Sequence, residues 1–172
     1  MGRWRPPQPK KSKYITAEGY KRLNDELKYL WKVKRPEITQ SVSEAAAQGD
    51  RSENAEYIYG KKQLREIDRR VRYLSKRLDD MTVVDRIPEN KDKVFFGAWV
   101  TIEDEEETRH RYRIVGPDEI EPGSDYISMD SPLAKQLLKK EIGDEIWLHK
   151  PNGEDIWYEI IAVDYQAYDT DP

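Results

Sequence analysis

The 172-residue sequence contains no cysteine, which excludes disulfides and thiolate metal sites. It also has no apolar run long enough to cross a bilayer and no signal-peptide core. We therefore expect a soluble, cytoplasmic protein without a membrane partner. Histidine is scarce as well: His110 and His149 each stand alone in a strand-like run, so neither is a catalytic candidate.

Charge, by contrast, is abundant and unevenly distributed. Charged residues make up 37% of the chain, against about a quarter in typical domains. Residues 1–86 carry 21 basic and 13 acidic residues, whereas residues 87–172 carry 9 basic and 21 acidic residues. The asymmetry favours two regions with different partners, although chance segregation of charge on solvated surfaces gives the same counts.

The first half of the chain predicts a helical hairpin. Residues 1–13 contain three prolines and five basic residues with almost nothing to bury, which predicts a disordered basic tail. Apolar residues then recur at alternating steps of three and four, before Pro36 and again after Gly49, as in a coiled-coil seam. Pro36 predicts a kink or local restart of the first helix near Arg35. Two such seams joined by a short turn predict an antiparallel coiled-coil hairpin over residues 14–86.

The second half predicts a small α+β domain over residues 87–166, followed by a tail at 167–172. After Pro88 the apolar residues fall into short aromatic and β-branched runs separated by Gly, Pro and acidic turns, which is typical of strands. One helix interrupts them, with Ser131 as N-cap and Pro132 in the first turn. The predicted fold class is therefore α+β in two domains, the second built on an antiparallel sheet.

The turn of the predicted hairpin, "AAAQGDRSENAEY" at residues 45–57, gathers carboxylates. Asp50 and Glu53 have the spacing of a capping box, so a purely structural role is open. A metal or water site is the alternative, because an acidic tip precedes a basic stretch over residues 61–77 and the pair suits a probe that follows a phosphate backbone. Two carboxylates are too few for Mg²⁺, which takes about six oxygen ligands, so a second molecule would have to supply the rest.

Several blocks of the sequence resemble the Gre transcript cleavage factors of bacteria, and within them the GreB type. The resemblance covers roughly residues 14–163. Its blocks occur in the family's order: "YITAEGYKRLNDELKYL", "RPEIT", "GDRSENAEY", "REIDRRVRYL", "VFFGAWV", "RYRIVGPDE" and "DYISMDSPLAKQLLKKEIGD". The motif GDxSENAEY at the turn of a helical hairpin is highly specific.

The resemblance implies a transcription elongation factor with an FKBP-like C-terminal domain that binds bacterial RNA polymerase at the rim of its secondary channel. The coiled coil would enter the channel and stimulate endonucleolytic cleavage at the 3′ end of backtracked nascent RNA, which rescues arrested complexes. The factor would not itself be an enzyme. It would act as a monomer and bind no cofactor when free, sharing Mg²⁺ only with the polymerase active site.

The same resemblance assigns the site residues. Asp50 and Glu53 match the tip acids that position the metal and the attacking water, with supporting roles for Ser52, Asn54, Glu56 and Tyr57. The candidate RNA contacts are the basic residues along the second helix: Lys61, Lys62, Arg65, Arg69 and Arg72. The candidate polymerase contacts lie in one segment: Asp125, Tyr126, Ile127, Ser128, Asp130, Ser131, Pro132 and Leu133.

Simpler interpretations stay open beside these assignments. Each basic residue of the shaft also suits a solvated coiled-coil flank, and the docking segment also reads as a strand entering a capped helix. Phe95, Phe96 and Trp99 are expected in the core. Two other functions remain: a channel-plugging inhibitor like the related Gfh proteins, which the SENAEY pattern disfavours, and an RNA-binding coiled-coil arm, which needs no tip acids.

Overall fold

The computed structural model describes residues 4, 6–49 and 53–165. They form two compact units, one spanning Glu18–Met81 and the other combining the residues before Glu18 with those after Met81. Residues 14–17 and 82–86, grouped with the hairpin in the sequence analysis, thus pack with the C-terminal residues. No helix in the described part of the chain is both long and apolar enough to traverse a membrane.

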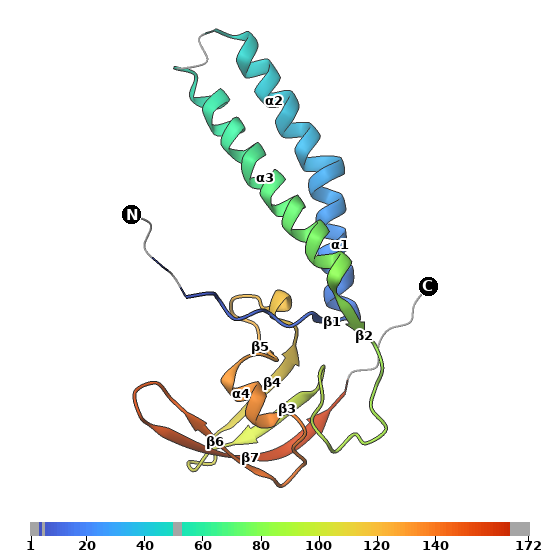
Figure 1. The fold of residues 1–172 in the computed structure, drawn as a ribbon, viewed down its shortest axis with the longest axis vertical. Coiled ribbons are helices and arrows are strands. Elements are labelled where there is room, and N and C mark those ends of the chain that lie inside the picture. Colours follow the sequence, from blue (N-terminus) through green and yellow to red (C-terminus); the bar gives the residue numbers. More distant parts are fainter. Residues whose placement is uncertain (1–3, 5, 50–52, 166–172) are drawn as a thin grey trace. The chain divides into compact units, whose positions relative to one another are not determined.

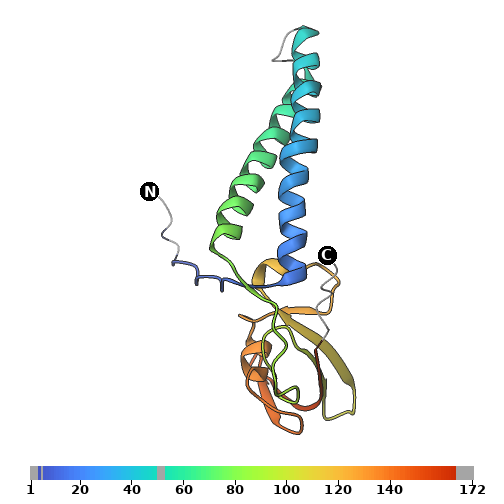
Figure 2. The same ribbon diagram turned by 90° about the vertical axis from the view of Figure 1, so that its right-hand side faces the viewer.

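The first unit is a helical hairpin (Figure 1). One arm consists of α1 (Ala17–Tyr29), a π-helical turn η1 (Leu30–Lys34) and α2 (Arg35–Ala47), and the other is α3 (Ala55–Asp80). The two arms lie side by side in both views (Figures 1 and 2). The buried residues follow the predicted seam: Leu23, Leu30, Val42, Ala45, Ile67, Leu74 and Leu78.

The π-helical turn explains how the first arm passes Pro36 without breaking. Proline has no N–H to continue the helical ladder. Just before it, the N–H of Arg35 donates to the carbonyl of Leu30, five residues back, and α2 begins at Arg35 with Pro36 in its first turn. As predicted, a new α-helix starts near Arg35, although the backbone stays helical across the π turn. The wider turn also shifts the seam by one residue, because steps of four and three from Leu30 lead to Ser41 whereas Val42 is buried.

The second unit is built around a five-stranded sheet in the order β5-β4-β3-β7-β6 (Figure 1). Its strands are β3 (Trp99–Glu103), β4 (Arg109–Val115), β5 (Tyr126–Ser128), β6 (Glu145–His149) and β7 (Asp155–Asp164). Every pair is antiparallel except β4–β5, which is parallel. The helix α4 (Pro132–Leu137) begins at the predicted cap, where Ser131 Oγ accepts from the N–H of Ala134 at 3.2 Å.

The core of this unit lies between the sheet and α4. It consists mainly of fully buried aliphatic side chains: Val94, Val100, Ile102, Ile114, Leu137 and Ile160. Phe95, Phe96 and Trp99, expected in the core, are only half-buried. The Arg111 guanidinium instead lies over the Trp99 ring, 4.4 Å from the ring centroid, and Tyr126 lies beside the ring.

A two-stranded parallel sheet that the sequence did not predict holds both ends of the hairpin. It pairs β1 (Tyr14–Thr16) with β2 (Thr82–Val84). Thr16 is 1% exposed, and its N–H and hydroxyl both donate to the buried carboxylate of Glu119, the N–H at 3.1 Å. The same carboxylate accepts from the N–H of Gly116 at 2.7 Å, at the start of the short helix η2 (Pro117–Glu119).

Gly60 of α3 lies directly against Val42 of α2. A β-carbon at position 60 would lie 2.5 Å from Val42 Cγ2. We expect Gly60→Ala to destabilise the hairpin by about 1 kcal/mol in urea unfolding, because the overpacking cost exceeds the roughly 1 kcal/mol gained in helix propensity.

The control adds Val42→Ala to the Gly60→Ala variant. The smaller side chain makes room for the new methyl group, so the double variant should lose less stability than the two single variants together. Strictly additive losses would contradict the steric explanation.

Candidate functional site

The turn between the two arms is organised by Asn54. Its Oδ1 accepts from the N–H of Tyr57 at 3.2 Å, which caps α3, and its Nδ2 donates to the carbonyl of Ala45 in α2 at 2.7 Å. A capping box would place Glu53 inside the first turn of α3. Because α3 begins at Ala55 with Asn54 as its N-cap, the capping box considered for Asp50 and Glu53 is wrong. Asn54 therefore has the capping role that the sequence left open for Asp50 and Glu53.

The described tip acids face solvent. Glu53 lies just outside α3 and Glu56 lies in its first turn, and both are exposed, whereas Tyr57 is half-buried. Asp50 and Ser52 lie outside the described residues. Within the described ranges, no three acidic or histidine side chains come together as a metal site. Glu53 thus offers a hard oxygen ligand that is suited to Mg²⁺ but cannot hold the ion alone.

The five candidate RNA contacts are all exposed along α3. At 100° per residue, Lys61, Arg65 and Arg72 project from one flank of the helix. Arg72 also helps to lower the pKa of Asp68, although the main cause is the hydrogen bond from Arg35, whose Nε lies 2.8 Å from Asp68 Oδ1. The flank therefore keeps a surplus of positive charge around one neutralised pair.

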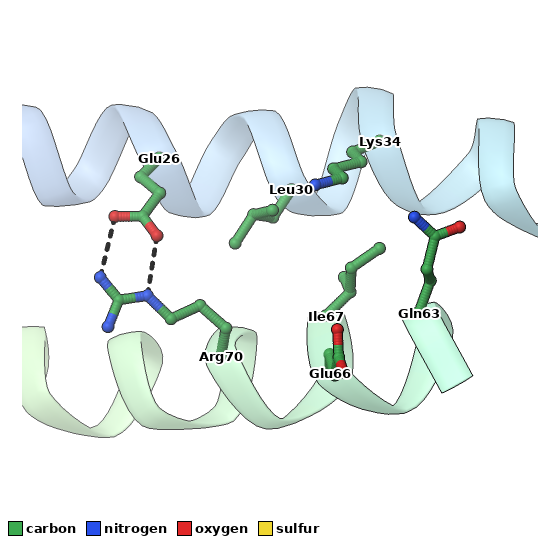
Figure 3. A pocket seen from close by; sticks show the side chains of 7 residues that line it. All are labelled: Glu26, Leu30, Lys34, Gln63, Glu66, Ile67 and Arg70. Carbon is green, nitrogen blue, oxygen red and sulfur yellow. Dashed lines mark hydrogen bonds and ion pairs between the residues drawn. The ribbon is translucent and has the colours of Figure 1, made fainter. Parts of the chain in front are cut away.

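The opposite flank is occupied differently. Arg70 forms a two-point ion pair with Glu26, from Nε to Oε1 at 2.7 Å and from Nη2 to Oε2 at 3.0 Å (Figure 3). The pair lies at one end of a depression of about 300 Å³ beside the π-helical turn, which Leu30, Lys34 and Ile67 also line. Arg70 is also exposed, but its pairing with Glu26 joins the two arms.

Sequence reasoning missed Trp31, a large and exposed apolar side chain on the first arm. It is 55% exposed, with the Arg35 guanidinium 5.4 Å from its ring centroid. Lys28 and Lys32 line the depression on one side of it. The available signal was its position directly after the seam residue Leu30, where a coiled coil normally carries polar side chains.

The predicted docking segment divides into supporting and accessible residues. Ile127 and Leu133 pack against the core, and Ser131 caps α4. Asp125 and Pro132 are exposed. Tyr126 and Ser128 are half-buried in β5, where the Arg113 guanidinium lies 5.7 Å from the Tyr126 ring centroid.

Asp130 of this segment is bound from within the chain. Its Oδ2 accepts from the backbone N–H of Ser12 at 2.9 Å, and its Oδ1 accepts from the Ser12 hydroxyl. The predicted disorder of residues 1–13 is therefore wrong for Ser12 and for Lys13, whose carbonyl accepts from the N–H of Thr82 at 2.8 Å. The residues before them have no regular secondary structure where they are described.

Known families match both units. A family model described as "Transcription elongation factor, N-terminal" matches residues 13–83, and one described as "Transcription elongation factor, GreA/GreB, C-term" matches residues 89–165.

Individual relatives agree with these models. Transcription elongation factor GreB of Yersinia pestis is 55% identical over 161 residues, covering 94% of each chain. GreB of Pseudomonas putida is 59% identical over 158 residues, or 91% of this chain and 97% of that one. A solved structure of Gfh1 from Thermus thermophilus is 23% identical and covers 88% of this chain and 97% of that one, with a TM-score of 0.39 that is too low to support an argument.

The double role of Asn54 can be tested by two substitutions. Asn54→Ala removes the cap and the bond to Ala45, so we expect a loss of about 1–2 kcal/mol in local stability and faster hydrogen exchange at the amides of Tyr57 and Ile58. Asn54→Asp keeps a capping oxygen and loses only the donor, so its exchange should be intermediate. Unchanged exchange in Asn54→Ala would contradict the capping role.

Proposed function

Because the chain belongs to the GreA/GreB family of transcription elongation factors, we propose that it stimulates RNA cleavage by RNA polymerase through the tip of its hairpin. As an elongation factor of the GreB type, it acts on backtracked complexes. The hairpin would enter the secondary channel, and the RNA would be cut near its 3′ end. The observation that carries the proposal is the exposed carboxylate of Glu53, which folding of the tip does not use.

The tip would contribute charge and position. Asn54 fixes the start of α3 and ties the turn to α2, so Glu53 sits at a defined point directly before the helix. Glu53 and Asp50 would hold a divalent ion together with ligands from polymerase. When bound, that ion would supply positive charge for activation of water and for the developing charge on the phosphate. The two carboxylates would orient the attacking water by accepting its hydrogen bonds.

We propose that the hydrolytic centre belongs to polymerase, so the protein is a stimulating factor and no enzyme by itself. A shared site would supply the oxygen ligands for Mg²⁺ that two tip carboxylates alone cannot provide. The seam of the hairpin is buried within a single chain, which supports a monomer.

The exposed bases of α3 would follow the extruded RNA. Phosphate contacts require accessible cations, and Lys61, Lys62 and Arg65 are exposed in the turns of α3 nearest the tip. Arg70 is excluded from this role by its pairing with Glu26. The docking contacts to polymerase would come from the exposed residues of the docking segment, Asp125 and Pro132, together with the half-buried Asp130.

A channel-plugging inhibitor shares most of these features. It needs the hairpin and the docking segment as well. We favour a cleavage factor because the tip carries the SENAEY pattern that is associated with cleavage.

The tip carboxylates can be tested by removing charge without changing shape. We expect Asp50→Asn and Glu53→Gln each to lower the cleavage rate of a backtracked complex by roughly a hundredfold, with binding to polymerase unchanged, because the shared cation loses a ligand. Released RNA from a 3′-labelled transcript is the readout. Glu56→Gln is the matched control and should have a much smaller effect. Equal losses in Glu53→Gln and Glu56→Gln would reject a specific role for Glu53.

The basic flank can be tested by the depth of backtracking. Changing Lys61, Lys62 and Arg65 together to Gln should slow cleavage of deeply backtracked complexes by about tenfold and of shallow ones by less than about twofold, because only a long extruded RNA reaches these charges. The control for net charge is a variant in which three exposed lysines of the other unit are changed to Gln. These are Lys91, Lys140 and Lys150. Equal slowing on both substrates would indicate a docking role instead.

A further inference from the structure

Ser12 attaches the N-terminal segment to the predicted docking segment. Both donors of Ser12 are used: the backbone N–H bonds one carboxylate oxygen of Asp130 at 2.9 Å and the hydroxyl bonds the other. Both residues are half-buried. The next residue, Lys13, precedes β1, and its carbonyl accepts from the N–H of Thr82. The chain is therefore fixed on the C-terminal side of Ser12.

The two segments that meet here are oppositely charged. The docking segment, residues 125–133, contains Asp125 and Asp130 and no Lys or Arg, and residues 1–13 contain five basic residues and no Asp or Glu. A partner surface that recognises an acidic docking segment must itself be cationic. The basic N-terminal segment has the same character as such a partner.

We propose that residues 10–13 are an intramolecular ligand of the docking segment and compete with polymerase for Asp130. The proposal rests on the docking role of Asp130 in the proposed function. Ser12 engages both carboxylate oxygens, so a cationic side chain of polymerase can make a two-point contact with Asp130 only after Ser12 has left. The segment thereby sets the affinity of docking.

The strength of the Ser12–Asp130 contact suits a segment that lowers the affinity of docking without preventing it. Hydrogen bonds to a charged group stabilise more than neutral ones, but holding residues 10–13 in place costs backbone conformational entropy, which reduces the net stability of the contact. The apparent dissociation constant rises by the inverse of the fraction of molecules in which Asp130 is accessible. If about a tenth of the molecules are open at any moment, docking is weakened about tenfold without being blocked.

Substitutions at Ser12 grade the contact while leaving every charge of the segment in place. Proline removes both donors, alanine removes only the hydroxyl, and threonine keeps both. We expect full-length Ser12→Pro to bind polymerase about tenfold more tightly than wild type and Ser12→Ala about threefold more tightly, with Ser12→Thr unchanged. In an Asp130→Ala background, binding should be weaker and Ser12→Pro should give no gain.

The contact itself can be measured without polymerase. In the free protein, the amide resonance of Ser12 should shift on Asp130→Ala, because its hydrogen-bond acceptor is removed. An unchanged chemical shift of the Ser12 amide in Asp130→Ala would overturn the proposal.

The binding data separate the remaining outcomes. Equal affinity of wild type and Ser12→Pro would overturn the competition and leave the proposed function standing. Weaker binding by Ser12→Pro would also overturn it, because the segment would then add to the docking surface. If no variant, including wild type, bound polymerase, the docking role would fail and the competition with it.

Discussion

The segments that lead into the hairpin depend on the hydrogen bonds accepted by the buried carboxylate of Glu119. It is 1% exposed and collects the N–H and hydroxyl of Thr16 together with the N–H of Gly116. A two-stranded sheet of three residues per strand has little stability of its own. Glu119 holds the last residue of β1 in place, and Gly116 allows the Tyr14 carbonyl to approach where any β-carbon would collide with it. Both chain segments that lead into the hairpin are thereby fixed next to each other.

At the other end of the hairpin, the residue that stabilises the turn differs from the residue proposed as a metal ligand. Asn54 caps α3 and bonds Ala45, so the turn is stable without help from the neighbouring acid. A carboxylate that also capped the helix would give up part of its hydrogen-bonding capacity to the backbone. Glu53 keeps its oxygens exposed, as a ligand offered to another molecule requires.

The sequence predicts what depends on local periodicity and misses what depends on distant pairing. The seam of the arms follows from spacing, the restart at Arg35 follows from Pro36, and the cap of α4 follows from the Ser131-Pro132 pair. The cap of α3 was misplaced because the spacing of Asp50 and Glu53 fits a capping box while Asn54 fits a plain N-cap, and spacing does not choose between them. The β1–β2 pairing joins residues 68 positions apart, and the Ser12–Asp130 contact spans 118. Three-residue strands and single serines carry no period from which either could be found.

The π-helical turn at Leu30–Lys34 bears on how this arm is compared with those of its relatives. The turn takes up one residue more than an α-helical path between the same two seam positions, and the apolar pattern resumes one place later at Val42. An arm that is α-helical throughout corresponds to this one only if a single gap is placed between Leu30 and Arg35. A gap elsewhere would align polar positions of one protein with seam positions of the other, and would assign buried side chains to the wrong face along half the arm.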